Sequence, residues 1–167
     1  MPGRHATAMY IFSLERQDSL VLGKNFLTLF NPVGSDKVIT VGAFFVSYMA
    51  TVASPLYPMR GFRISAAPTG GTLVTDAEIC RFDTQRYAPA GVLRYGDPAC
   101  TPQAALFNVS PGLQQGQNLS SMVEQVDAPQ GFNPFILYPG EGVVVRQGAG
   151  SVGHMWNMSI LWRELKG

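Results

Sequence analysis

Hydrophobic and polar residues alternate with a period of two along most of this chain, which is the spacing of β-strands with one buried face. The alternation is clearest near the two ends of the sequence. The apolar positions there are Ala8, Tyr10, Phe12 and Leu14, and Trp156, Met158, Ile160 and Trp162. Both tryptophans are expected to pack in a core, since a sugar-binding platform would place aromatic rings closer together and on loops.

Further strands are expected wherever apolar runs are bounded by Gly, Pro, Asn or Asp. These segments are 26–30, 38–50, 59–66, 72–75, 78–82, 92–95, 104–109, 135–138, 143–147 and 155–165. Short strands separated by turns in this way predict an all-β, antiparallel β-sandwich or a barrel of about eight to ten strands. No internal repeat is present, so residues 8–167 are expected to form a single domain, preceded by an extended N-terminal arm, residues 1–7.

Two of these segments carry more specific expectations. Segment 38–50 has no charge and is apolar on both alternating faces, which predicts a central strand with an inner core face and an outer face under a loop or a neighbour. In segment 59–66 the pattern places Phe62, Ile64 and Ala66 inward, with the intervening residues outward.

The stretch 110–134 is rich in Gln and Gly and alternates weakly, so it is expected to be one long loop. Within it, Ser121 and Glu124 have the spacing of a capping box, in which a hydroxyl and a carboxylate satisfy free backbone N–H groups at a helix start. At most one helical turn is predicted there.

Composition narrows the classes of function. The hydrophobic fraction is 46% but the charged fraction is only 14%, and the net charge is +1. Such a low charge is typical of a surface buried against other chains, or of one covered by uncharged polar residues. Phosphate binding needs clustered Lys and Arg, so no nucleic-acid partner is expected. No window of about 20 apolar residues and no signal peptide are found, so no membrane association and residence in the cytoplasm are expected.

Candidate catalytic and metal groups are scarce. The two histidines, His5 and His154, have no acid close in sequence, and the two cysteines are expected to be free thiols unless their strands pair. About half of the acids lie in or beside turns, and the others are expected on the solvated surface. The glycine loop 148–153 precedes a strand, whereas a phosphate-binding loop precedes a helix. We therefore expect no enzyme activity, no metal and no cofactor.

Three segments carry a resemblance. They read Leu-Phe-Asn-Pro-Val-Gly-Ser-Asp-Lys-Val at 29–38, Ala-Pro-Thr-Gly-Gly-Thr-Leu-Val-Thr at 67–75, and Tyr-Pro-Gly-Glu-Gly at 138–142 before a strand, a Gly-rich loop and an aromatic strand. Together they resemble small virion structural proteins of tailed bacteriophages. The resemblance covers less than half of the chain and does not extend to 84–134.

The resemblance implies a jelly-roll-like β-sandwich that serves as a capsid decoration (cement) protein on the capsid exterior. Its partners would be the major capsid protein and copies of itself, as a homotrimer, with assembly in the host bacterial cytoplasm. A tail, baseplate or fibre-associated structural or receptor-binding subunit is the alternative, and a glycan hydrolase the third. The candidate assembly contacts are Met1, Pro2, Arg4, His5, Tyr87, Arg94, Tyr95, Gln114, Gln115 and Phe132.

Overall fold

The structure is a computed structural model that describes residues 8–18, 23–50, 59–82, 88–103, 105–109, 123–125, 135–147 and 154–166. These residues form 12 strands and one short 3-10 helix, η1. The elements are β1 (Ala8–Asp18), β2 (Asn25–Phe30), β3 (Lys37–Ala50), β4 (Met59–Ile64), β5 (Thr72–Leu73), η1 (Asp76–Glu78), β6 (Cys80–Arg81), β7 (Val92–Tyr95), β8 (Ala105–Val109), β9 (Val123–Gln125), β10 (Phe135–Leu137), β11 (Gly142–Gln147) and β12 (His154–Lys166).

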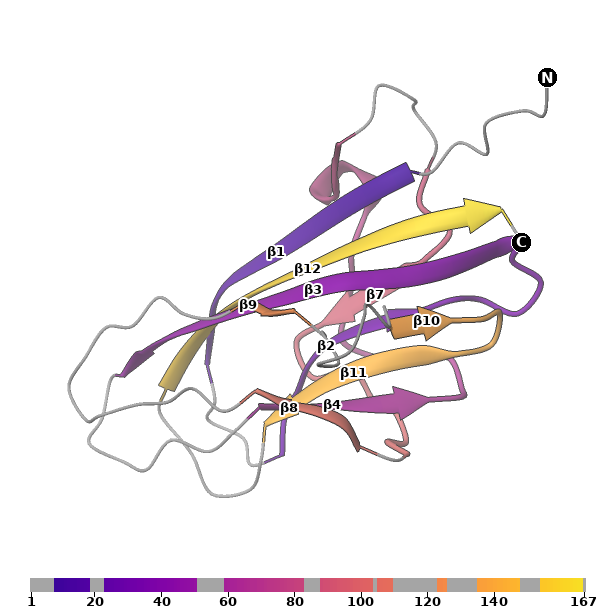
Figure 1. The fold of residues 1–167 in the computed structure, drawn as a ribbon. Coiled ribbons are helices and arrows are strands. Elements are labelled where there is room, and N and C mark those ends of the chain that lie inside the picture. The colour runs from indigo at the N-terminus through magenta and orange to yellow at the C-terminus, as the bar shows by residue number, and fades with distance from the viewer. Residues whose placement is uncertain are drawn as a thin grey trace.

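The strands form two sheets that pack face to face (Figure 1). Sheet A has the order β10-β3-β12-β1-β6, with β9 also paired to β3, and sheet B has the order β5-β7-β2-β11-β4-β8. All of the strand pairs are antiparallel. The predicted all-β, antiparallel sandwich is therefore confirmed.

Strands from the two halves of the chain pair in reverse order. β1 pairs with β12, β2 with β11, β3 with β10, and β4 with β8, and successive pairs alternate between sheet A and sheet B. The chain is thus one long hairpin rolled onto itself, which is the arrangement of a jelly roll. The remaining strands, β5, β6, β7 and β9, are short additions to this eight-stranded roll.

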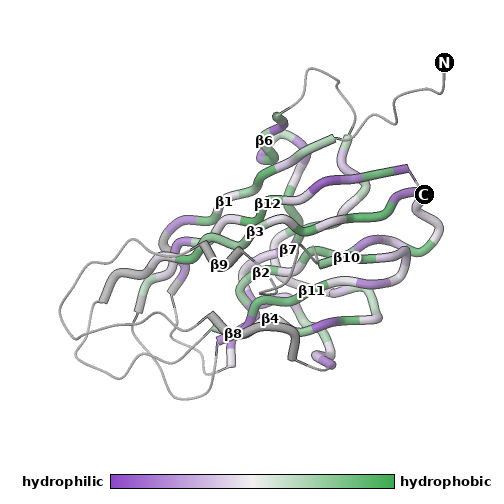
Figure 2. Tube along the Cα trace, in the orientation of Figure 1, coloured by the Kyte–Doolittle hydropathy of each residue, from purple (hydrophilic) through white to green (hydrophobic). Residues whose placement is uncertain are grey.

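The core lies between the sheets and contains both tryptophans, each with no exposed surface. Trp162 stacks on Tyr10 with ring centroids 5.3 Å apart, and Trp156 meets Phe26 edge-on at 6.4 Å. Figure 2 shows hydrophobic positions recurring along the strands of both sheets. The expected core packing of Trp156 and Trp162 is confirmed.

A β-bulge at Gly42 explains why segment 38–50 is apolar on both alternating faces. Val41 and Ala43 pair with consecutive residues of β12, so Gly42 is an extra residue that reverses which positions point inward. The core residues of β3 are Ile39 and Val41 before the bulge and Phe44 and Val46 after it. Each apolar set therefore supplies two residues to the same core, while Val38 and Phe45 point to the outer face of the sheet. The predicted inner core face is confirmed, and the cover expected over the outer face stays a prediction.

The predicted helical turn was wrong over its described part: Val123–Gln125, which include Glu124 of the expected capping box, form β9 and pair with β3. Ser121 lies outside the described residues. A capping box occurs instead at η1, between Thr75, which precedes the helix, and Glu78, its last residue. Glu78 Oε2 accepts hydrogen bonds from the backbone N–H and from the hydroxyl of Thr75, both at 2.7 Å. These two bonds hold the pKa of Glu78 below its usual value, and the bond from the backbone N–H has the larger effect.

Smaller corrections concern strand ends. β5 and β6 are each two residues long, shorter than the predicted 72–75 and 78–82. β4 ends at Ile64, and Ala66 is exposed because the chain bends away from the sheet there. Phe62 and Ile64 lie on the outer face of sheet B, in a second apolar cluster apart from the main core, so the predicted inward orientation of all three residues was wrong.

Candidate assembly surfaces

Asn31 ties together two turns at one end of the sandwich. Its side-chain amide donates to the carbonyls of Lys37, at 2.9 Å, and Leu137, at 3.0 Å. Its backbone N–H donates to the carbonyl of Glu141 and its carbonyl accepts from Gly140, both at 2.8 Å. Asn31 has no exposed surface. The Asn-Pro turn and the Pro-Gly-Glu-Gly turn, two of the segments that carry the phage resemblance, therefore form one structural unit.

Each of these two turns exposes a large apolar side chain. Val33 is 83% exposed and Tyr138 is 56% exposed. The turns lie side by side, since a Cβ on Gly140 would lie 3.4 Å from Val33 Cγ2. Beneath them, Arg63 forms an ion pair with Glu141 at 2.7 Å and lies 5.2 Å from the centre of the Phe135 ring.

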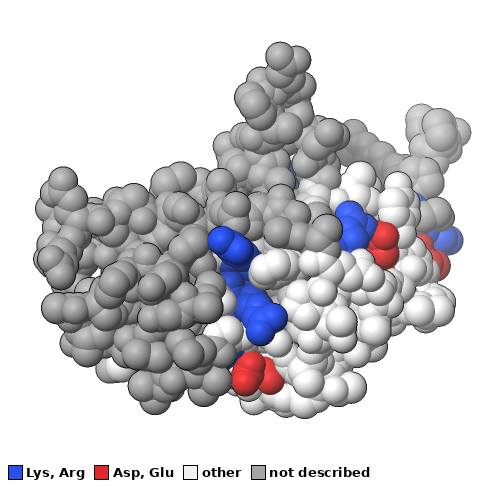
Figure 3. All heavy atoms as spheres, turned by 90° about the horizontal axis from the view of Figure 1, so that it is seen from below, with Lys and Arg blue, Asp and Glu red and all other residues white. Residues whose placement is uncertain are grey.

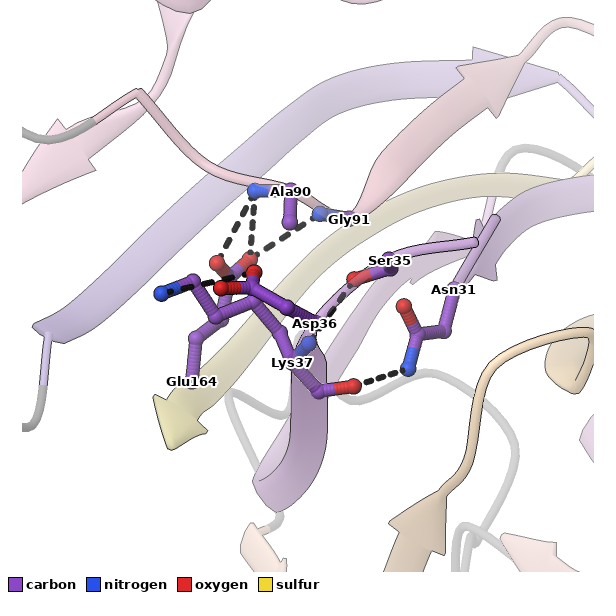
Figure 4. Close-up of polar contacts among 7 residues, drawn as sticks. All are labelled: Asn31, Ser35, Asp36, Lys37, Ala90, Gly91 and Glu164. Atoms are coloured by element: carbon purple, nitrogen blue, oxygen red, sulfur yellow. Dashed lines mark hydrogen bonds and ion pairs between the residues drawn. The ribbon is translucent and has the colours of Figure 1, made fainter. Parts of the chain in front are cut away.

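Glu164 is a buried acid, so its expected place on the solvated surface was wrong. It is 4% exposed and follows Trp162 on the inward face of β12. Oε1 accepts the N–H groups of Ala90 and Gly91, both at 3.0 Å, and the indole N–H of Trp162 at 3.1 Å. Oε2 accepts the Ala90 N–H at 2.9 Å. Figure 4 shows the carboxylate facing the segment that leads into β7.

These hydrogen bonds connect the two sheets, because Glu164 belongs to sheet A and Gly91 precedes the first strand residue of β7 in sheet B. Gly91 is closely surrounded: a Cβ there would lie 2.9 Å from Ile39 Cδ1 and from Leu29 Cδ1. Among the described residues, no cation forms an ion pair with Glu164. The carboxylate therefore serves as an acceptor of N–H groups that would otherwise be buried without partners.

The apolar part of the outer face of sheet B is covered by the chain itself. Residues 98–103 cross this face, held at one end by Asn25, whose amide donates to the Pro98 carbonyl at 3.0 Å. At the other end the Gln103 N–H donates to the carbonyl of Arg63 at 2.8 Å. Beneath the segment lies a second, smaller apolar cluster: Phe30, Ile64 and Val144, with Phe62 and Cys100 packed against it.

The outer face of sheet A differs, because no described segment crosses it. Six apolar side chains on it are only half-buried. We call this set the sheet-A face: Met9, Ile11, Val38, Phe45, Ile136 and Leu161. Two exposed side chains adjoin it, Phe82 (61% exposed), which follows β6 beside Met9, and Leu165 (37% exposed). A charged residue, Arg163, lies between Met9 and Thr40 in the row of residues that crosses the sheet there.

The sequence analysis anticipated the part of this face on β3 but missed the parts on β1 and β12, although a signal for them exists. In β1 the residues between the inward positions include Met9 and Ile11, and in β12 they include Leu161. A strand with a fully solvated outer face would carry polar residues there. Apolar residues at both alternating positions of β1 and β12 indicate a second contact surface.

Of the predicted assembly contacts, the structure describes Arg94 and Tyr95. Arg94 is half-buried and donates from Nη1 to the carbonyl of Gly70 at 2.9 Å. The ring of Tyr95 packs against the chain's own core, 6.1 Å from that of Phe12. The assembly role of both stays a prediction. The other contacts lie outside the described residues: Met1, Pro2, Arg4, His5, Tyr87, Gln114, Gln115 and Phe132.

Candidate chemical groups are few in the described part of the chain. It holds no group of three or more His, Cys, Asp or Glu residues placed to bind a metal ion. The described residues also include no helix long and apolar enough to span a membrane. Cys80 is exposed and Cys100 half-buried, and both are free thiols. Burial raises the pKa of Cys100, while Arg146 lowers it to a smaller extent.

Comparison of the chain with known protein families, with curated proteins and with solved structures finds no match. The fold and its surfaces are therefore the basis for assigning a function.

Proposed function

We propose that this chain is a bacteriophage virion structural protein, a capsid decoration (cement) protein that binds across joints between major capsid subunits. The sheet-A face is the surface that we assign to the capsid. This assignment concerns a contact function, without catalysis.

The contrast between the two outer sheet faces carries the proposal. Sheet B covers its outer apolar cluster with residues 98–103, whereas the described chain leaves the sheet-A face uncovered. Apolar patches left open on a protein surface mark interaction sites, because burying them against a partner is favourable. The charged fraction of 14% agrees with this, since few charges oppose close packing between chains.

Architecture and resemblance give further support. Jelly rolls build viral capsid domains, and they also build lectin domains, so the fold alone does not assign a function. The phage resemblance favours a capsid role over a lectin role. Two of its three segments meet at Asn31, so the residues that carry the resemblance form one unit in this chain.

The test is binding of the purified protein to expanded, undecorated capsids, with purified tails of the same phage as a second arm. Phe82→Asp places a charge beside the sheet-A face, and Leu73→Asp is the matched control, because Leu73 is 49% exposed on the edge strand β5 of sheet B. We expect wild type and L73D to bind capsids alike and F82D to bind at least about fivefold more weakly.

Failure of the wild type to associate with any head surface would overturn the proposal, and binding to tails alone would favour the tail subunit. Equal binding by F82D and L73D would remove the sheet-A face from the contact. Circular dichroism of both variants verifies that the fold is retained.

A further inference from the structure

We propose that Arg60 and Arg146 form a binding site for carboxylates of a neighbouring protein, on the outer face of sheet B. This inference rests on the proposed function only in that it takes the partner to be another protein. The site lies on the opposite side of the sandwich from the sheet-A face.

The register of the sheet places the two arginines side by side. Arg60 on β4 pairs directly with Arg146 on β11, and both have the outward orientation of Phe62 and Val144 in the same strands. Figure 3, seen from the side of β4 and β8, shows basic side chains forming a continuous stripe on this face. Like charges directly opposite each other on neighbouring strands repel and destabilise the pair.

Within the described residues no acid compensates for this repulsion. The ion pairs there join Lys37 to Asp36, Arg63 to Glu141 and Arg81 to Asp76. Asp97 lies in the vicinity, since both it and Arg146 act on the charge of the Cys100 thiol. However, Asp97 Oδ1 accepts the backbone N–H of Asn25 at 3.0 Å and forms no ion pair with either arginine.

One of the guanidinium groups is held in place. Arg146 Nε donates to the carbonyl of Gly23 at 2.7 Å, and a Cβ on Gly23 would lie 2.9 Å from Arg146 Nη2. This bond occupies Nε and leaves the Nη groups as donors, while Arg60 is exposed. A fixed guanidinium beside a free one suits a carboxylate, which accepts two parallel N–H bonds from an arginine.

Two arginines are too few for a nucleic acid. Phosphate backbones bind through many contacts, each of which releases counterions. A net charge of +1 supplies no wider basic field. One or two acidic side chains on a protein surface match the size and charge of the site.

The test uses a hexaglutamate peptide and a hexathymidylate as probes at low salt, followed by NMR of the arginine Nε–H signals in the full chain. We expect the peptide to shift Arg60 and Arg146 more than Arg163, an exposed arginine of sheet A. Arg60→Gln should weaken peptide binding about three- to fivefold, and Arg163→Gln should leave it unchanged. The Arg60 side chain makes no hydrogen bond or ion pair with a described residue, so R60Q is expected to fold normally.

Equal shifts at all three arginines, or equal weakening by R163Q, would show only general attraction and overturn the site. Tighter binding of hexathymidylate than of hexaglutamate would overturn the choice of a protein carboxylate. This outcome can be told apart from that of the capsid assay. If the wild type binds capsids but R60Q binds the peptide as tightly as the wild type does, the arginine site is ruled out and the proposed function is not.

Discussion

The carboxylate of Glu164 on the last strand accepts the backbone N–H of Gly91 at 3.0 Å, although the two residues are 73 positions apart in the sequence. The bond joins the end of β12 in sheet A to the start of β7 in sheet B. It also brings an acidic side chain into the core beside Trp162.

Replacing Glu164 by Gln should lower the free energy of unfolding by about 1–3 kcal/mol, because one acceptor oxygen becomes an amide that cannot accept the Ala90 N–H. Denaturant unfolding followed by tryptophan fluorescence measures this, and the indole N–H signal of Trp162 should shift as well. Glu15→Gln is the control: Glu15 is exposed, so its replacement should change stability by no more than about 0.5 kcal/mol. A Glu164 variant as stable as that control would contradict the role of the carboxylate.

Replacing Gly91 by Ala should destabilise the fold by about 1–3 kcal/mol, because the new Cβ would lie 2.9 Å from Ile39 Cδ1 and Leu29 Cδ1. Gly42→Ala is the matched control, since its nearest neighbour, the Leu161 carbonyl oxygen, would lie 3.8 Å away. Thermal unfolding of the two variants should differ clearly, with G42A close to wild type. Similar melting temperatures for both would show that the core around Gly91 adapts without cost.

Replacing Asn31 by Ala should lower the free energy of unfolding by about 2–4 kcal/mol, because the carbonyls of Lys37 and Leu137 both lose their side-chain donor. Chemical denaturation measures the loss. Gln103→Ala removes an exposed hydrogen bond to Ser65 Oγ and should cost no more than about 0.5 kcal/mol. Equal effects of the two changes would mean that Asn31 does not hold the turns together.

Cys100 should react with iodoacetamide more slowly than Cys80 at neutral pH. Burial raises the pKa of Cys100, so less of it is thiolate, and the thiolate is the nucleophile. Its rate should keep rising at a pH where an unperturbed thiol has levelled off. Mass spectrometry of Cys80→Ser and Cys100→Ser variants assigns each rate to one thiol. Faster reaction at Cys100 would contradict the raised pKa.

Local patterns in the sequence were sufficient to predict strands and the inward residues of β1 and β12. This is because a strand with one buried face must alternate, and Gly, Pro, Asn and Asp end it at turns. The same rule could have located Glu164, which continues the series Trp156, Met158, Ile160 and Trp162. An acid in such a series is buried only where N–H groups are placed to donate hydrogen bonds to it. Here the donors are the backbone N–H groups of Ala90 and Gly91, which are far away in the sequence.

Pairings between distant segments were decided only by the tertiary structure. The bulge at Gly42 depends on the register of β3 against β12, and it brings Ile39 and Val41 onto the same core face as Phe44 and Val46. The opposition of Arg60 and Arg146 depends on the register of β4 against β11. The sequence by itself determined an all-β chain of low charge. Which face of each sheet the chain covers followed from long-range pairing, because side-chain neighbours across a sheet have no fixed separation along the chain.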